Sequence, residues 1–302
     1  MPHDHDHAHA GAVSRAFLIG VALNSIIVVT QVVYGLVAHS MALLADAGHN
    51  LGDVLGLALA WGAAHLAKRK PTKRHTYGMR RATILSALAN AILLVVATGG
   101  VAWESISRLR APGDVEAGTV VMVAGIAVVA NGVSAAFFLR GGKRDVNVRA
   151  AFLHLAGDAA ISLGVVVAGL VIARTGWTWL DPAVGLVVSG LILVSTWSLL
   201  RRSMRLALDA VPDGLELDEI RAYLAGLPGI AEVHDLHVWG MGATEAALTA
   251  HLVVAEGAAL DACFLPDAAR AIHEKFGIDH TTLQIEPPAT TEPCSLAPEE
   301  VI

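Results

Sequence analysis

The sequence predicts an all-α membrane domain, a bundle of six transmembrane helices, followed by a small cytoplasmic α+β domain. The first observation is composition: 55% of the 302 residues are hydrophobic and only 16% are charged, whereas soluble domains carry about 25% charged residues. The second is that several long apolar segments are each sufficient to cross about 30 Å of hydrocarbon. The third is a change after residue 205, where amphipathic and alternating patterns replace the continuous apolar runs.

These observations divide the chain into four parts: a tail over residues 1–13, a membrane domain over 14–205, a cytoplasmic domain over 206–288 and a second tail over 289–302. The first tail is rich in His and Asp and has no apolar periodicity. Short His-rich tracts of this kind tend to bind metals. The apolar run that follows is longer than the roughly 7–15-residue core of a secretory signal peptide, so we interpret it as a span.

The charge of the loops between the expected spans predicts on which side of the membrane each loop lies. The spans cover residues 14–37, 41–66, 82–106, 119–139, 148–173 and 180–200. Lys and Arg gather after the second, fourth and sixth spans, whereas the other loops have few basic residues or offset them with acidic ones. Because basic loops stay on the cytoplasmic side, both termini are expected in the cytoplasm, in a multi-pass protein of the lipid bilayer.

Charge and cysteine content argue against two other classes of protein. The formal net charge is −6, and the sequence has no basic stripe that would suggest a nucleic-acid partner. Cys263 and Cys294 are the two cysteines, both in the last third of the chain. Two cysteines do not make a disulfide framework.

Five elements are expected in the cytoplasmic domain, in the order helix, strand, strand, helix, strand. The helices cover residues 214–227 and 262–276, where apolar residues recur at helical spacing; Pro228-Gly229 ends the first and Gly277 ends the second. The strands cover residues 230–239, 245–254 and 281–286. This αββαβ order predicts a ferredoxin-like or metallochaperone-like open-faced sandwich, with both helices on one face of a mixed sheet.

Two motifs with the same spacing lie inside the apolar runs: His49 with Asp53 in the second span, and His154 with Asp158 in the fifth. Four residues apart on a helix, the two side chains share one face and lie about 6 Å apart along the axis. The two spans run in opposite directions, so packing side by side brings all four groups, called the quartet below, to one depth. Ionisable groups in a bilayer are costly and usually mark an ion or substrate path. Polar contacts between helices are the alternative role, but two copies of one spacing favour a site.

The ligand types of the quartet predict which ion it would take. Two imidazoles and two carboxylates make a tetrahedral shell of the kind that Zn²⁺ prefers, whereas Mg²⁺ and Mn²⁺ prefer oxygen-only octahedra. Co²⁺ and Cd²⁺ are less well excluded. Only a neutral His binds metal, so protons and metal compete for the site. We therefore expect transport of a divalent cation, chiefly Zn²⁺, with protons as the counter-ion. Asp46, one turn before His49, is expected in an outer vestibule.

The chain resembles the cation diffusion facilitators, a family of zinc-type metal/proton antiporters, over essentially its whole length. The likeness lies in the His-rich start, the six spans, the paired HxxxD motifs and the αββαβ domain, and most specifically in residues 40–53, 233–239 and 280–286. The resemblance implies that the quartet is the transport site and that His49 places the chain in the zinc-transporting branch. It also implies efflux by alternating access, a homodimer formed through the cytoplasmic domain, and a bacterial inner membrane.

The resemblance implies a second metal site in the cytoplasmic domain. His234, His237 and His251 lie on the two neighbouring strands, and Glu286 lies on the third. By their motifs, His234, His251 and Glu286 match the ligands of a regulatory metal, here Zn²⁺, at the dimer interface. The alternative is that these histidines are ordinary polar residues of an exposed sheet face.

The chain departs from the family pattern around this second site and in one loop. Some members have His at the position of Gln284, and some have two tail cysteines where this chain has only Cys294. Completion of the site by Cys294 or His280 stays open. His75 matches a loop position that binds metal in part of the family, but Met79 occupies the position of its partner. A solvated basic loop is therefore expected there.

Two other functional classes were weighed against a secondary active transporter. A membrane metalloenzyme would need more His clusters near the membrane surface or an HExxH helix, and the sequence has neither. No enzymatic activity is therefore expected. A metal-sensing membrane scaffold would bind Zn²⁺ through the cytoplasmic domain without transport. The quartet argues against the scaffold, because a sensor does not need ligands in the middle of the bilayer.

Overall fold

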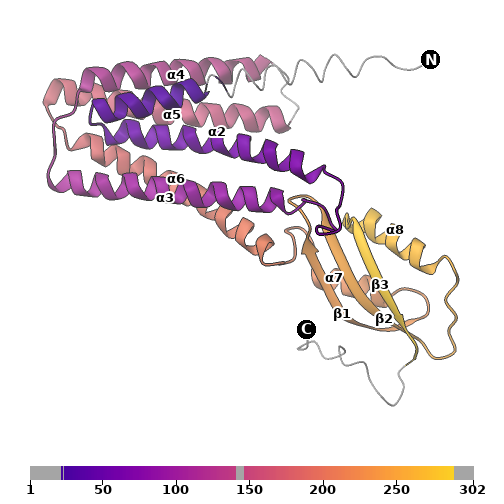
Figure 1. The fold of residues 1–302 in the computed structure, drawn as a ribbon. Coiled ribbons are helices and arrows are strands. Elements are labelled where there is room, and N and C mark those ends of the chain that lie inside the picture. Colours follow the sequence, from indigo (N-terminus) through magenta and orange to yellow (C-terminus); the bar gives the residue numbers. More distant parts are fainter. Residues whose placement is uncertain (1–21, 23, 141–145, 289–302) are drawn as a thin grey trace, which may run out of the picture. The chain divides into compact units, whose positions relative to one another are not determined.

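The computed structural model describes residues 22, 24–140 and 146–288. Contacts within the chain define two compact units, Met1–Leu59 with Ala89–Leu199 and Ala60–Leu88 with Leu200–Ile302. The long helices form most of the first unit, and the sheet belongs to the second (Figure 1). The tails expected over 1–13 and 289–302, and the start of the first expected span, lie outside the described residues.

Five long helices and one shorter helix occupy the positions of the expected spans. They are the helix Asn24–Val37, α2 (Met41–Ala67), α3 (Ala82–Arg110), α4 (Ala117–Arg140), α5 (Val146–Thr175) and α6 (Leu180–Ala207). Among the described residues, four of them (α3 to α6) are long and apolar enough to cross a membrane. Only 22–33% of their most apolar stretches is buried within the protein. Most of these apolar side chains therefore point outward, as helices in contact with lipid require.

The helix α2 packs closely against α3 and α6 because small residues face those neighbours. A Cβ added at Gly52 would lie 2.9 Å from Cδ1 of Leu94 in α3. A Cβ added at Gly185 of α6 would lie 3.0 Å from the backbone carbon of Met41, at the start of α2. Small residues allow such close approach in helical membrane proteins. Two neighbours thus fix the position of the helix that carries His49.

The N-terminus of α2 is capped by a side chain from another helix. The carboxyl group of Asp181, at the start of α6, accepts hydrogen bonds from Ser40 Oγ (2.5 Å) and from the backbone N–H of Met41 (2.5 Å). Asp181 and Ser40 are both buried. The first N–H groups of a helix have no partner within the helix, so Asp181 supplies one and joins the ends of α2 and α6.

The domain that the sequence predicts in the cytoplasm contains α7 (Leu217–Ala225), β1 (Ile230–Gly240), β2 (Ala246–Val254), α8 (Phe264–Phe276) and β3 (His280–Glu286). The strands lie in the order β1-β2-β3, with β1 and β2 antiparallel and β2 and β3 parallel. This is the αββαβ order expected from the sequence. Residues of α7 and α8 share one buried apolar cluster with the strands, so both helices cover the same face. The opposite face is called the open face below.

A bulge interrupts the pairing of β1 with β2. His234 pairs with His251 and His237 pairs with Thr249, so β1 has one residue more than β2 between these two pairs. The extra residue belongs to a segment in which Asp235 has φ +49°. Bulges insert one residue and redirect the side chains that follow.

Candidate metal centres

The quartet is assembled crosswise by two antiparallel helices. His49 Nε2 of α2 lies 2.9 Å from Asp158 Oδ1 of α5. His154 Nε2 of α5 lies 3.4 Å from Asp53 Oδ2 of α2 and 3.7 Å from Asp158 Oδ2. The two imidazole rings are 6.2 Å apart between centroids. Each histidine therefore contacts an acid of the other helix, because i and i+4 residues on both helices face each other at one depth.

Three members of the quartet are within coordination range of one another. His49, Asp53 and Asp158 each offer a ligand atom, and these atoms all lie within 4.8 Å of one another. His154 is outside this group and is the most exposed member, with 50% of its side chain accessible against 6% for Asp158. The structure thus brings together all four predicted residues, with His154 at the edge of the set.

Asp46 lies in a buried hydrogen-bond network and not in the outer vestibule that the sequence suggested. Its Oδ2 accepts hydrogen bonds from Gln31 Nε2 (2.5 Å) and from Ser162 Oγ (2.8 Å). Gln31 Oε1 in turn accepts one from Asn50 Nδ2 (2.9 Å). All four side chains are buried.

This network joins three helices next to the quartet. Gln31 belongs to the helix Asn24–Val37, Asp46 and Asn50 belong to α2, and Ser162 belongs to α5. Asn50 directly follows His49 in the sequence, and Ser162 lies one helical turn after Asp158. The network therefore ties the two helices that carry the quartet to each other and to the helix Asn24–Val37.

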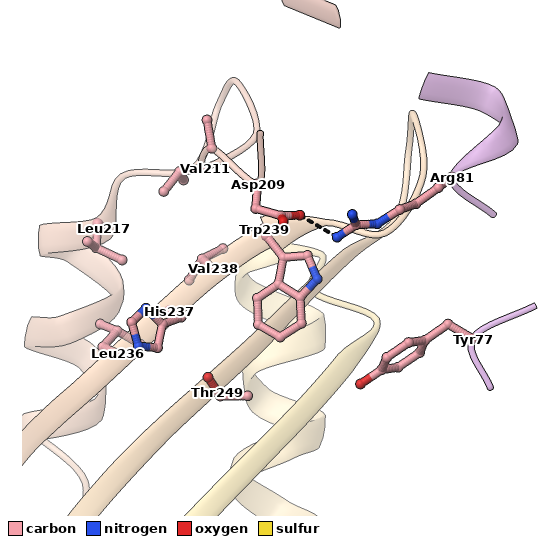
Figure 2. Close-up of a pocket in the computed structure, with 11 residues that line it drawn as sticks. Tyr77, Arg81, Asp209, Val211, Leu217, Leu236, His237, Val238, Trp239 and Thr249 are labelled. Atoms are coloured by element: carbon pink, nitrogen blue, oxygen red, sulfur yellow. Dashed lines mark hydrogen bonds and ion pairs between the residues drawn. The ribbon is translucent and has the colours of Figure 1, made fainter. Parts of the chain in front are cut away.

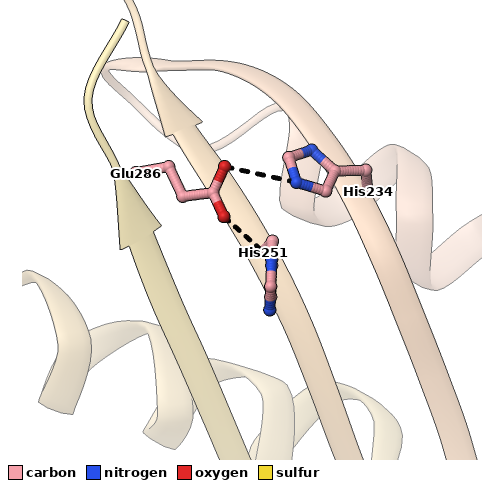
Figure 3. A group of neighbouring side chains, drawn as sticks. All are labelled: His234, His251 and Glu286. Atoms are coloured by element: carbon pink, nitrogen blue, oxygen red, sulfur yellow. Dashed lines mark ion pairs between the residues drawn. The ribbon is translucent and has the colours of Figure 1, made fainter. Parts of the chain in front are cut away.

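The cytoplasmic domain places one ligand candidate on each of its three strands (Figure 3). Glu286 Oε1 lies 2.9 Å from His251 Nδ1, and Glu286 Oε2 lies 3.3 Å from His234 Nε2. The three residues, called the trio below, offer ligand atoms that all lie within 4.8 Å of one another. Sequence reasoning named these three residues, and the fold brings them together.

His234 provides a test of whether the trio suits a metal ion. Its side chain is buried, and within the described chain neither ring nitrogen has a hydrogen-bond partner. A buried polar group without a partner costs about 1–3 kcal/mol. Two imidazoles and a carboxylate are ligands that Zn²⁺ accepts. The trio therefore fits a zinc ion, which would satisfy a ring nitrogen of His234.

The other candidates around the trio take different positions. Gln284 Nε2 donates to Glu286 Oε1 (3.1 Å), so it borders the trio. His280 begins β3, about 20 Å along the strand from Glu286, and its ring lies edge-on to Tyr77 with centroids 5.4 Å apart. Cys294 is outside the described residues. His75 is exposed in the loop before α3.

A pocket of about 650 Å³ lies beside β1 in the same unit (Figure 2). An ion pair between Arg81 and Asp209 occupies its charged edge. The trio does not belong to its lining, so this pocket is separate from the candidate metal centre. The residues that line it are Tyr77, Arg81, Asp209, Ala210, Val211, Leu217, Leu236, His237, Val238, Trp239 and Thr249.

Sequence reasoning gave no role to Asp181, Ser162 or Asp235. Asp181 had a signal, since an Asp followed by Pro begins an apolar run and reads as a helix start. Asp235 also had one. In regular alternation one residue lies between two apolar positions, but two lie between Val233 and Leu236, which indicates a bulge. Ser162 had no local signal, since it lies in a continuous apolar run.

Comparison with protein families gives two matches that together span most of the chain. The cation efflux transmembrane domain matches residues 17–206, and the cytoplasmic domain of cation efflux proteins matches residues 212–288. Together with the apolar helices, the first match defines a multi-pass integral membrane protein of the cation transporter class, not an enzyme.

Three relatives align over nearly their whole length. The metal cation efflux system protein CzcD of Cupriavidus metallidurans is 34% identical over 93% of this chain and 89% of that protein. The zinc transporter ZitB of Escherichia coli is 36% identical over 95% and 93%. A cadmium, cobalt and zinc/H(+)-K(+) antiporter of Bacillus velezensis is 30% identical over 95% and 92%. The chain belongs to the cation diffusion facilitator family, the one that its motifs resemble.

Proposed function

We propose that this chain exports divalent cations, chiefly Zn²⁺, across a bacterial inner membrane in exchange for protons. The crosswise contacts of the quartet carry the proposal, because they place two imidazoles and two carboxylates between α2 and α5. The names of the relatives, a zinc transporter and a cadmium, cobalt and zinc antiporter among them, support the same ion class.

Competition between protons and metal at the quartet would couple the two fluxes. His49 and His154 each face an acid of the opposite helix, and a protonated imidazole makes its strongest contact with such a carboxylate. Binding of Zn²⁺ requires the neutral imidazoles and so releases protons. The bundle would then rock to face outside, and protons would return to the quartet as Zn²⁺ leaves.

The proposed arrangement has six spans with both termini in the cytoplasm and a homodimer formed through the cytoplasmic domain. Five long helices, the shorter helix Asn24–Val37 and the basic loops after the second, fourth and sixth spans support this topology. The matched family of the cytoplasmic domain is one of dimerisation domains, which supports the homodimer.

The trio is the proposed regulatory site. His234, His251 and Glu286 would hold Zn²⁺ on the open face, one ligand from each strand. A bound metal would cross-link β1, β2 and β3. Zinc binding here without any transport defines the second candidate function, a metal-sensing scaffold. The buried ring of His234, whose nitrogens make no hydrogen bond within the described chain, favours it.

Zinc flux into proteoliposomes that contain a pH-sensitive dye tests the proposal. The wild type should move Zn²⁺ with opposing proton movement, and Asp158→Ala should abolish both. Asp114→Ala removes an exposed carboxylate from a loop and serves as the matched control, with flux like the wild type. Equal flux in Asp158→Ala and wild type would exclude the quartet. If no variant shows flux, and the protein still binds zinc in a way that His251→Ala abolishes, the results would favour the scaffold.

A further inference from the structure

The bulge in β1 changes which residues reach the open face. Val233, Leu236 and Val238 belong to the apolar cluster beneath α7 and α8. Two residues therefore fit between Val233 and Leu236, where a regular strand would hold one. These two residues are His234 and Asp235. Because of the bulge, an acid stands beside the trio on the open face.

The carboxylate of Asp235 lies between two histidines of that face. Its Oδ2 is 3.4 Å from Nε2 of His251, and its Oδ1 is 2.8 Å from Nε2 of His237. The side chains of Asp235 and His251 are mostly buried. His251 is a member of the trio, so Asp235 contacts the candidate metal centre through this ring.

The two nitrogens of His251 face different acids. Nδ1 lies 2.9 Å from Glu286, inside the trio, whereas Nε2 faces Asp235, outside it. A neutral imidazole carries one proton, and a carboxylate beside one nitrogen holds the proton there and leaves the lone pair on the other. In metalloproteins, a carboxylate placed in this way fixes the orientation and the tautomer of a histidine ligand.

We propose that Asp235 is a positioning residue of the cytoplasmic metal centre, which holds His251 as the Nε2–H tautomer so that Nδ1 binds the ion. This inference rests on the zinc site proposed for the trio and adds a residue and a ligand atom to it. His237 shares the same carboxylate, so it is the partner of Asp235 on the side away from the trio.

The backbone at Asp235 separates this role from a purely structural one. Its φ of +49° lies in the left-handed region, where Gly is favoured over other residues. Asp235→Gly therefore relieves backbone strain and removes the carboxylate at the same time. If Asp235 served only the bulge, the Gly variant would bind zinc at least as well as the wild type. If Asp235 positions His251, the affinity falls in spite of the relaxed backbone.

Zinc affinity of the full-length protein in detergent, measured by competition with a fluorescent chelator, provides the test. The background carries Ala at the quartet and at His3, His5, His7 and His9, so that the trio dominates binding. Asp235→Ala and Asp235→Gly should each weaken zinc binding by about 10–100-fold. Asp235→Asn keeps one acceptor oxygen and should restore part of the loss. Glu274→Ala is the matched control: it removes an exposed acid from α8, which covers the opposite face of the sheet, and should leave the affinity within about twofold.

Nitrogen-15 NMR of labelled histidines reads the tautomer directly. With zinc bound, the wild type should show His251 protonated at Nε2, and Asp235→Ala should lose this signature at the same zinc concentration. Zinc affinity in Asp235→Ala and Asp235→Gly equal to the wild type, with a large loss in His251→Ala, would overturn the positioning role alone. An unchanged affinity in His251→Ala would instead overturn the zinc site on which the inference rests.

Discussion

The capping of α2 by Asp181 gives a stability prediction that can be worked out from individual contacts. The Asp181→Ala substitution removes the acceptor for the Met41 N–H and for Ser40 Oγ, both at 2.5 Å. Ser40 and Met41 are buried, so water does not replace the lost acceptor. The Ala42 N–H, at 3.4 Å, contributes less.

The expected magnitude follows from the two short hydrogen bonds. A buried donor left without a partner costs about 1–3 kcal/mol. The Met41 N–H is fixed by the backbone and cannot find another acceptor, so the full cost applies. The Ser40 hydroxyl can rotate toward another acceptor, which reduces its cost. We expect Asp181→Ala to lower the free energy of unfolding by about 2–4 kcal/mol. Zinc transport should weaken as well, because α2 carries half of the quartet.

Equilibrium unfolding in mixed detergent micelles, followed by tryptophan fluorescence, measures this loss. Glu104→Ala is the control, since it breaks an exposed i,i+4 pair with Arg108 (2.9 Å). Such a pair contributes at most about 1 kcal/mol. If Asp181→Ala were no less stable than Glu104→Ala, the capping argument would be wrong, and the contacts of Asp181 would be incidental to the position of α2.

Three further substitutions test packing and hydrogen bonding elsewhere. Gly185→Ala places a Cβ 3.0 Å from the Met41 backbone and should destabilise the bundle by about 1–3 kcal/mol in the same unfolding assay. Gly190→Ala is the control on the same helix, because its Cβ meets no neighbour and should not destabilise the bundle. Asp46→Ala leaves the buried donors of Gln31 and Ser162 unpaired and should reduce zinc flux severalfold. Asp46→Asn keeps an acceptor oxygen and should reduce the flux less. A larger loss in Asp46→Asn than in Asp46→Ala would refute the hydrogen-bond role. Gly277→Ala should cost the cytoplasmic domain about 1 kcal/mol in thermal unfolding, because Gly277 ends α8 with φ +68°.

Features that depend on neighbours along the chain were predictable from the sequence. The αββαβ order followed from alternation and helical spacing, and the ends of β1 and β2 differ from the expected ones by a single residue. The meeting of His49 with Asp158 followed from the i, i+4 spacing on two antiparallel helices. The first helix of the cytoplasmic domain begins at Leu217 and not at 214, because Gly214 has φ +89° and lies outside the helix.

Features that depend on the rotation of one helix against another were not predictable in the same way. Asp46 is one turn from His49 in sequence, but its burial depends on Gln31 and Ser162, which come from two other helices. The exposure of His154 depends on how α5 is turned within the bundle. A single sequence specifies which residues share a helix face, and only the packed helices determine which neighbour that face meets.

The crosswise pairing of the quartet has a consequence for leakage. Two carboxylates with two protonated imidazoles carry no net charge, and neither do two carboxylates with two neutral imidazoles and one divalent cation. A quartet that holds neither protons nor metal would leave two negative charges uncompensated within the bilayer, where an isolated charge is expensive. On the proposed mechanism, the empty carrier is therefore disfavoured. Transport of either ion without the other would require the carrier to change its orientation while empty, so electrostatics alone suppresses this uncoupled flux.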